Sequence, residues 1–388
     1  MQESNQINKL DFEEEENGKN FFQIDLLKAI MIAFVILDHA LGYTSRAGLG
    51  SELWERMSIP MFLIILGFNM GKSFAREGET SLKKLYSFSY FKKKFWRYIF
   101  PYIIFYIVST SIGFFIYGTS FPNTFHENWF LEYILFQKSL LEGPGNWFIP
   151  VLFQSILLMP LLYYLFTKKP ILSLIICFAV EICMHLFLFF YIGPILGIED
   201  YLREIPFRQI ILLYLSAIGM GIWFSKNHKL FSWKNLYVWI LFPINLIYMI
   251  AWDFFGFRFQ VNGSEIVRGD YNYLTFVYSA LIFLIVLSIL PKNPKSFIGK
   301  AFSPLGKATF HIYLVQDLYF VLLYIIFNEV WLSPGFTGLV NPFGISSAEF
   351  LTNFYLLIIN WVICFSIGVL WWYIEKKVLG LILRKEKK

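Results

Sequence analysis

Long apolar runs recur along the whole chain, and the short stretches between them carry most of the charged residues. A helix needs about 20 predominantly apolar residues to cross a bilayer. Ten runs approach or exceed that length: 21–41, 56–74, 98–118, 147–166, 171–193, 208–225, 235–255, 273–291, 308–328 and 351–374. Inside a bilayer, backbone polar groups must bond within their own segment, which favours helices over open strands. The pattern predicts an all-α fold, a polytopic membrane bundle of about ten spanning helices.

Composition excludes an ordinary soluble protein. Of the 388 residues, 57% are hydrophobic and only 15% are charged, whereas a soluble domain carries about 25% charged residues. The net charge of +6 is explained by the placement of the lysines, so no nucleic-acid partner is expected. Cys177, Cys183 and Cys364 lie within apolar runs and lack the spacing of a disulfide or metal framework. They are predicted to be buried apolar residues, and no metal site is expected.

The lysines occupy alternate loops. The loops after the second, fourth, sixth and eighth runs, and the segment after the tenth, are lysine-rich, whereas the opposite loops contain a single lysine, Lys138. The positive-inside rule then places both termini in the cytoplasm of a cell-membrane protein. The expected organisation is an acidic tail over 1–20, one membrane domain over 21–378 and a basic tail over 379–388. The acidic start has no basic region, so we expect no cleavable signal peptide.

Ionisable side chains at membrane depth are costly and are therefore functional candidates. The first run contains Asp25, Lys28 and His39. Lys28 and His39 are eleven residues apart, so they share a helix face and lie about 16 Å apart along its axis. In the alternative interpretation, Lys28 snorkels to the inner headgroups and His39 meets the outer interface. The residues alone leave both interpretations open.

Other polar residues in the apolar runs are weaker candidates for a functional role. Glu181 and His185 are four residues apart and are interpreted as a structural pair inside the bundle. Asp317 beside Gln316 is a further candidate, and His311 is expected at the cytoplasmic interface. No hydrolase, zinc-protease, P-loop or dinucleotide fingerprint stands in a suitable context. The residues alone therefore leave two classes open, a transferase with a cytoplasmic donor and a transporter.

Several segments, taken in order, resemble the acyltransferase-3 family of integral membrane O-acyltransferases. The family's opening D-G-L-R-A-I is similar to residues 25–30, with His39 in register, and P-L-F-F-V-L-S-G-F is similar to residues 60–68. R-x-x-x-P matches 97–101, L-G-x-x-S-Y-x-I-Y-L-x-H is similar to 305–316, and Y-x-x-E-K-P to 373–377. The departures are Lys28 for arginine, Leu66 for serine and Gln316 for a frequent histidine.

The resemblance implies transfer of an acyl group, in this family often acetyl, from cytoplasmic acyl-CoA to an extracytoplasmic polysaccharide or related acceptor. His39 would be the general base, since an imidazole titrates near working pH, with Asp38 and Asp25 as orienting groups. The residues expected to bind the CoA phosphates are Lys28, Arg97, Lys93 and Lys94. Those expected to line the acceptor pocket are Trp147, Asn146, Gln316 and Asp317.

Three alternatives stay open beside this interpretation. The Asp38-His39 ending is also similar to the membrane heparan-α-glucosaminide N-acetyltransferase group, whose acceptor is an amine. A transporter or flippase of glycan or lipid-linked precursors is the rival class, although the chain shows no inverted repeat. The departures at Lys28 and Gln316 also allow an inactive relative, and Arg97 alternatively serves as an anchor at the inner membrane surface. The acyl chain, the acceptor and the oligomeric state are not specified by the sequence.

Overall fold

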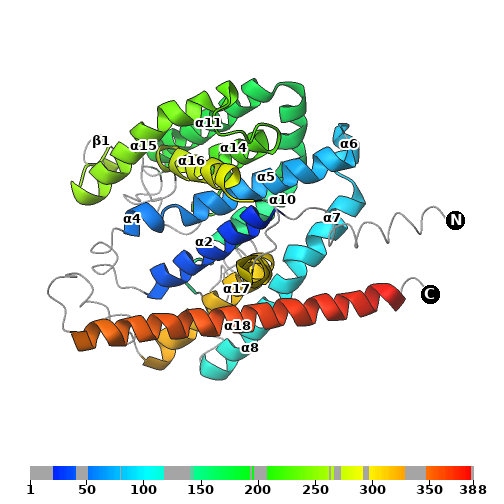
Figure 1. Ribbon diagram of the computed structural model, residues 1–388, viewed down its shortest axis with the longest axis vertical. Helices are drawn as coiled ribbons and strands as arrows, with labels where there is room; N and C mark the ends of the chain where they lie inside the picture. The colour runs from blue at the N-terminus through cyan, green and yellow to red at the C-terminus, as the bar shows by residue number, and fades with distance from the viewer. Residues whose placement is uncertain are drawn as a thin grey trace.

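Each of the ten predicted apolar runs coincides with a helix, so the predicted all-α fold is confirmed (Figure 1). The computed structural model describes residues 21–40, 51–78, 80–117, 141, 143–192, 195, 208–261, 264–265, 272–291, 297–327 and 347–385. The long helices are α2 (Phe22–Ala40), α5 (Ser58–Glu77), α8 (Phe100–Tyr117), α10 (Phe148–Lys168), α11 (Pro170–Phe187), α14 (Leu215–Lys226), α15 (Leu236–Phe254), α16 (Tyr273–Ile289), α17 (Phe297–Phe327) and α18 (Ser347–Lys385).

Short elements connect or extend these helices. They are α4 (Ser51–Trp54), α6 (Leu82–Leu85), α7 (Phe88–Lys94), the π-helices η1 (Phe95–Ile99) and η4 (Leu188–Ile192), the 3₁₀ helices η5 (Ile211–Tyr214) and η6 (Trp233–Asn235), and the strands β1 (Gln260–Val261) and β2 (Ser264–Glu265). The two strands pair antiparallel in a two-residue ribbon. The described part of the chain is therefore built almost entirely from helices.

Six described helical segments are long and apolar enough to cross a membrane: 58–77, 82–116, 148–168, 170–192, 233–252 and 357–380. Two shorter apolar helices span Ile211–Lys226 and Tyr273–Ile289. These lengths identify a multi-pass membrane protein. The total of about ten spans stays a prediction.

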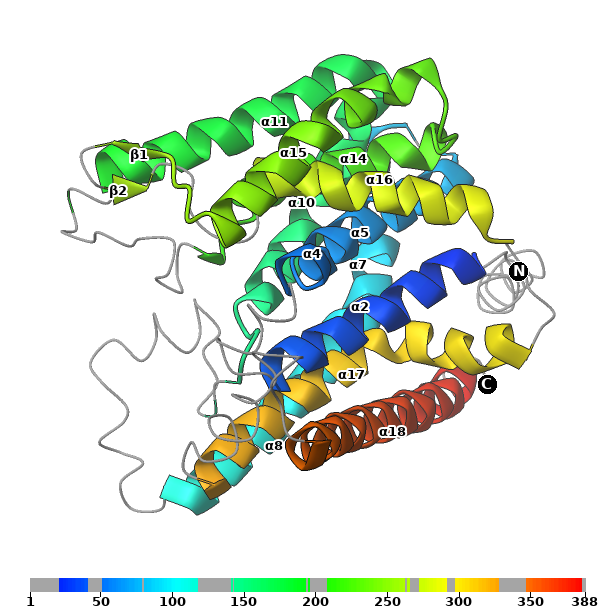
Figure 2. The ribbon, with the colours of Figure 1, turned by 60° about the vertical axis from the view of Figure 1, so that its left-hand side comes forward.

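Helix α2 lies in the middle of the bundle (Figure 2). It packs against α5 on one side and against α17 on the other, and α17 packs in turn against α18. Helices α11, α14, α15 and α16 form a second group that is joined to α2 through α5. This position places the polar residues of α2 against α17 along most of its length.

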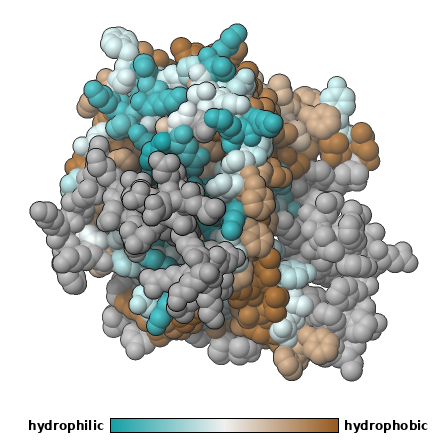
Figure 3. Space-filling model, turned by 90° about the vertical axis from the view of Figure 1, so that its right-hand side faces the viewer, coloured by the Kyte–Doolittle hydropathy of each residue, from teal (hydrophilic) through white to brown (hydrophobic). Residues whose placement is uncertain are grey.

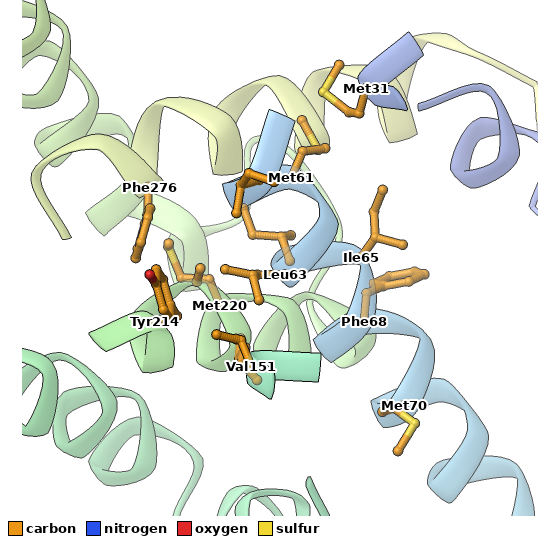
Figure 4. Packing of buried hydrophobic residues seen from close by; sticks show 14 of the residues in the cluster. Met31, Met61, Leu63, Ile65, Phe68, Met70, Val151, Tyr214, Met220 and Phe276 are labelled. Carbon is orange, nitrogen blue, oxygen red and sulfur yellow. The ribbon is translucent and has the colours of Figure 1, made fainter. Parts of the chain in front are cut away.

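Glycines set the contact between α5 and α14. A Cβ atom on Gly67 would lie 2.2 Å from the carbonyl oxygen of Ile218, and one on Gly221 would lie 2.1 Å from that of Ile64. Small residues let two membrane helices approach at backbone distance, where van der Waals contact holds them. Buried side chains from α5, α14, α10 and α16 fill the flanks of this contact (Figure 4).

Helix α10 continues through Pro160. Proline has no N–H, so the carbonyl of Ile156 loses its helical donor. The hydroxyl of Tyr90 on α7 donates to this carbonyl at 2.8 Å, and the Tyr90 side chain is buried. A carbonyl that would be unsatisfied inside the bundle is thereby paired, and α7 is fixed to α10.

The predicted start of the third apolar run, residue 98, is later than the start of the corresponding helix in the structure. Its helix starts at Phe88 rather than 98, because Ser87 accepts a hydrogen bond from the backbone N–H of Tyr90 at 3.2 Å and caps α7. The basic composition of α7 hides this turn from a search for apolar runs. The π-helix η1 follows, in which the N–H of Phe100 donates to the carbonyl of Phe95, five residues earlier.

The prediction that all three cysteines are buried is wrong for Cys183, which is exposed, whereas Cys177 and Cys364 are buried. A weakly polar thiol on the outside of a membrane helix faces lipid at little cost, so burial is not required there.

The lysines predicted to share one side gather at one end of the bundle. Exposed lysines lie on α6 and α7 and near the end of α18, at the right-hand end of Figure 1. Figure 3 looks onto this end and shows hydrophilic side chains grouped above apolar flanks. The basic end is therefore a structural feature of the described chain.

Candidate active site

His39 lies in the last turn of α2, where α17 passes beside it. Its Nδ1 atom is 2.7 Å from Oε1 of Gln316, which is fully buried. The Gln316 Nε2 group donates to the carbonyl of Pro144 at 3.4 Å. The Phe320 ring meets the imidazole edge-on, with centroids 6.0 Å apart. Two residues of α17 and the segment before α10 therefore surround this histidine.

The segment 143–147, which leads into α10, approaches His39 with its backbone. Gly145 has a φ of +106°, and a Cβ atom there would lie 3.4 Å from Cε1 of His39 and 3.5 Å from the Tyr313 ring. Only glycine adopts this conformation without strain. The hydroxyl of Tyr313 donates to the carbonyl of Gly145. Helix α2, helix α17 and this segment thus meet at the imidazole.

Asp317, next to Gln316, is fully buried against the same segment. A Cβ atom on Gly143 would lie 2.0 Å from the carbonyl oxygen of Asp317, so the two backbones are in direct contact. Tyr102 of α8 and Tyr313 both lie within electrostatic range of the Asp317 carboxyl group. The structure therefore brings the predicted Gln316 and Asp317 together with His39.

Trp147 and Asn146 lie just before the first turn of α10, in the segment that reaches His39. The indole of Trp147 stacks on Tyr214 with centroids 5.8 Å apart, and the guanidinium of Arg208 lies 4.9 Å from the indole centroid. Asn146 is buried. Both predicted acceptor residues are near the site, and Arg208 is a cation that sequence reasoning missed, because it lies in no recognisable motif.

At the other end of α2, Asp25 holds Lys28. The Lys28 Nζ atom is 3.0 Å from Oδ1 of Asp25, and the Ser303 hydroxyl lies 3.3 Å from Oδ2 and donates to it. A Cβ atom on Gly306 would lie 2.3 Å from the Asp25 carbonyl oxygen, so α17 touches α2 there. Asp25 is about 21 Å from His39 along the helix. It can orient Lys28 but is too distant to orient the imidazole.

Two further cations act on Lys28. The charges of Arg97 and Lys307 both interact with its ammonium group. Arg97 is exposed on η1, and its guanidinium lies 5.4 Å from the centroid of Tyr98. Lys307 was missed by sequence reasoning, although it directly follows Gly306 in the L-G motif. Lys28 and the two cations within electrostatic range of it, Arg97 and Lys307, are named the basic cluster, and three such charges could together hold an anion.

The two remaining predicted cations differ in their surroundings. Lys94 lies 6.0 Å from the centroid of Tyr98, beside Arg97. Lys93 instead pairs with Glu77 at 3.5 Å, and both side chains are about half exposed (50% and 42%). A surface pair of this kind contributes little, roughly 0–1 kcal/mol. The structure therefore associates Lys94, more than Lys93, with the basic cluster.

A series of aromatic rings lies between the basic cluster and His39. Tyr98 meets Phe310 edge-on at 5.5 Å, and Phe310 stacks on Tyr313 at 6.5 Å. Phe148, in the first turn of α10, meets Tyr313 at 6.0 Å. Because Phe310 and Tyr313 are on α17 and α17 runs beside α2, the series connects the two ends of α2.

Comparison with known families decides the class of protein. The family model for acyltransferase-3, described as an acyltransferase domain, matches residues 21–374. The chain belongs to the acyltransferase-3 family. No curated protein and no solved structure gives a significant match to it. The protein is therefore a membrane acyltransferase.

Asp38, the second predicted orienting group of this acyltransferase, directly precedes His39 in α2. It is buried on α2, but one residue along a helix corresponds to a turn of about 100° from His39. The neighbour on Nδ1 of His39 is Gln316. The orienting role of Asp38 stays a prediction.

His311, which the sequence suggested for the cytoplasmic interface, packs between α17 and α18. It is buried, its Nε2 atom is 3.1 Å from Oε2 of Glu375 on α18, and its ring meets Trp371 edge-on at 5.1 Å. The two partners come from the L-G and Y-x-x-E-K motifs of the acyltransferase. This contact joins α17 to α18 and explains those motif residues as structural.

A second buried polar group lies away from the site. Glu181 is fully buried, and its Oε2 atom accepts the backbone N–H of Ser216 at 2.8 Å. Ser216 is in the first turn of α14, so the carboxyl group satisfies a helix N-terminus inside the bundle. His185 meets Tyr273 edge-on at 5.8 Å. The partners that the structure shows are a backbone N–H for Glu181 and an aromatic ring for His185, so the pairing of the two residues with each other stays a prediction.

Proposed function

We propose that this acyltransferase moves an acyl group, acetyl in the first instance, from cytoplasmic acyl-CoA to a hydroxyl of an extracytoplasmic glycan. The observation that carries the proposal is the layout of α2. One end holds the basic cluster, the other holds His39, and the aromatic series of Tyr98, Phe310 and Tyr313 connects them. The separation of about 16 Å suits a donor that carries anionic phosphates and a long, thin thioester arm.

The donor binds at the basic cluster. Lys28, Arg97 and Lys307 pair with the phosphates of CoA through charge-assisted hydrogen bonds, and Lys94 adds charge at the rim. Asp25 keeps the Lys28 ammonium group in place. The pantetheine arm then follows the aromatic series toward His39, where the thioester carbonyl is presented to the acceptor.

His39 acts as the general base. As the acceptor oxygen attacks the thioester carbonyl carbon, the imidazole removes the hydroxyl proton and a C–O bond forms. The tetrahedral intermediate collapses, the C–S bond breaks, and the CoA sulfur leaves with the proton that His39 returns. The acceptor is held by Trp147, Asn146 and Asp317 around segment 143–147. Each step balances without a further co-reactant.

Labelled acetyl-CoA supplied to the purified protein tests the proposal. In sealed vesicles with the donor outside and a glycan acceptor inside, label should appear on the acceptor. Movement of a glycan precursor without label would instead support a transporter. Binding of acyl-CoA without transfer or transport would indicate an inactive relative.

The proposal requires the basic end to face the cytoplasm in the cell membrane, with both termini inside. In a variant with alanine at the three native cysteines, Ser89→Cys on α7 should react with an impermeant maleimide only after permeabilisation. Gln260→Cys, exposed on β1, should react in intact cells. The reverse labelling would overturn the orientation that the lysines predict and the cytoplasmic donor with it.

Removing Arg97 should weaken donor binding. We expect Arg97→Ala to raise the acyl-CoA concentration for half-maximal rate by roughly tenfold, the effect of one lost charge-assisted contact of about 1.4 kcal/mol. The difference from wild type should shrink as salt screens the contact. Lys93→Ala, which removes a cation already paired with Glu77, is the control and should change the donor requirement little. An unchanged requirement in Arg97→Ala would return Arg97 to the role of an anchor.

A further inference from the structure

We infer that Gln316 is a positioning residue that holds His39 in the tautomer with the proton on Nδ1, which makes Nε2 the nitrogen that accepts the acceptor's proton. The inference rests on the proposed function for its catalytic consequence, but the tautomer itself is a property of the structure. It changes the role of Gln316 from binding the acceptor to orienting the base.

The hydrogen bonds of Gln316 determine which way its amide points. The Nε2 group faces the carbonyl of Pro144 at 3.4 Å. A carbonyl only accepts hydrogen bonds, so the amide must present its NH₂ there and its oxygen to the imidazole. A flipped amide would bring two oxygen acceptors face to face in a buried position, which is unfavourable.

The oxygen of Gln316 then fixes the imidazole. Oε1 lies 2.7 Å from Nδ1 of His39 and can only accept, so Nδ1 must be the donor. In a neutral imidazole the other ring nitrogen is then unprotonated and available as a base. The partner on one histidine nitrogen generally sets the tautomer and orientation of the ring.

Packing keeps the ring in this orientation. Gly145 places its backbone near Cε1 of His39, and Phe320 meets the ring edge-on. The Tyr313 hydroxyl donates to the Gly145 carbonyl. That bond holds the segment that closes on the ring. Gln316 is fully buried, which suits a group that supports the base more than one that meets a polar acceptor.

Two substitutions separate this role from bulk packing. Gln316→Met has nearly the same size but cannot accept a strong hydrogen bond, whereas Gln316→Glu keeps an acceptor oxygen at the same reach and, as a carboxylic acid, can still donate to the Pro144 carbonyl. We expect Gln316→Met to lower kcat by about 10- to 100-fold with the KM for acyl-CoA unchanged, because the basic cluster is distant. Gln316→Glu should restore kcat to within a few-fold of wild type.

Nitrogen-15 NMR of histidine-labelled protein in nanodiscs reads the tautomer without any activity. At a pH where His39 is neutral, and with its signals assigned by comparison with His39→Ala, the wild type should show a protonated Nδ1 and an unprotonated Nε2. Gln316→Met should show a mixture of tautomers, and Gln316→Glu should match the wild type.

A wild-type spectrum with the proton on Nε2 would overturn the inference, and so would a normal kcat in folded Gln316→Met. If the wild type transfers no acyl group at all, the proposed function fails. The spectrum alone then decides whether Gln316 fixes the tautomer, so the two failures are distinguishable.

Discussion

His39→Ala is expected to lose most acyl transfer, because it removes the only imidazole that the described residues place where the donor arm and the acceptor meet. A positioned general base contributes about 10²–10⁴-fold to rate. Binding of acyl-CoA should be nearly unchanged, since the basic cluster lies about 16 Å away along α2. Turnover of labelled acetyl-CoA and, separately, equilibrium binding of CoA to the purified variant measure the two quantities.

His185→Ala is the matched control, a buried histidine outside the site. Its expected defect is a lower thermal unfolding midpoint, because the substitution leaves a cavity beside Tyr273. Transfer per folded molecule should be retained. If His39→Ala keeps more than about a tenth of the wild-type turnover, its loss of rate is smaller than the smallest effect expected of a general base. That result would assign the chemistry to another residue.

Gly67→Ala is expected to prevent normal folding, although it adds a single methyl group. That group would lie 2.2 Å from the carbonyl oxygen of Ile218, a distance that forces α5 and α14 apart and disturbs the contact at Gly221. Overpacking of this kind costs about 1–3 kcal/mol or more, and here the opposing atom belongs to a rigid backbone. Folded yield after detergent extraction and the thermal unfolding midpoint should both fall sharply.

Gly380→Ala tests whether the instability expected of Gly67→Ala comes from the helix contact rather than from the replacement of a glycine as such. No atom lies within 4 Å of a Cβ built on Gly380 of α18. There, alanine is favoured over glycine in a helix by about 1 kcal/mol, so the variant should be as stable as wild type or more so. Equal stability of Gly67→Ala and wild type would show that the two helices separate without cost.

The apolar runs predicted the helices because burial in lipid imposes one rule on every spanning segment. Their ends were less predictable, since a lysine-rich turn such as α7 is helical through its Ser87 cap and its contact with α10 rather than through apolarity. The close contact at Gly67 depends on Gly221 in a segment about 150 residues later. No local pattern contains that pairing.

In the candidate site, too, local features were predictable from the sequence and contacts between distant segments were not. The spacing of Lys28 and His39 on one helix is local, so their shared face was predictable. The partners that complete each end come from α17: Ser303 and Lys307 at the basic cluster, and Gln316 at the imidazole. Which side chain meets which across two helices depends on packing set by glycines such as Gly306, and one sequence does not specify it.

The π-helix η1 lies between α7 and α8 in one continuous helix and changes the direction in which the side chains of α8 face relative to those of α7. Tyr90 and Tyr102 both face α10, the first through the Ile156 carbonyl and the second through the Phe153 ring at 5.3 Å. They are twelve residues apart, so at about 100° per residue a regular α-helix would leave them about 120° out of phase. The wide turn takes up one extra residue, which reduces the difference to about 20°. A regular α-helix over the same twelve residues would turn one of these tyrosines away from α10, whereas deleting a single residue from η1 would give an α-helix in which both still face it.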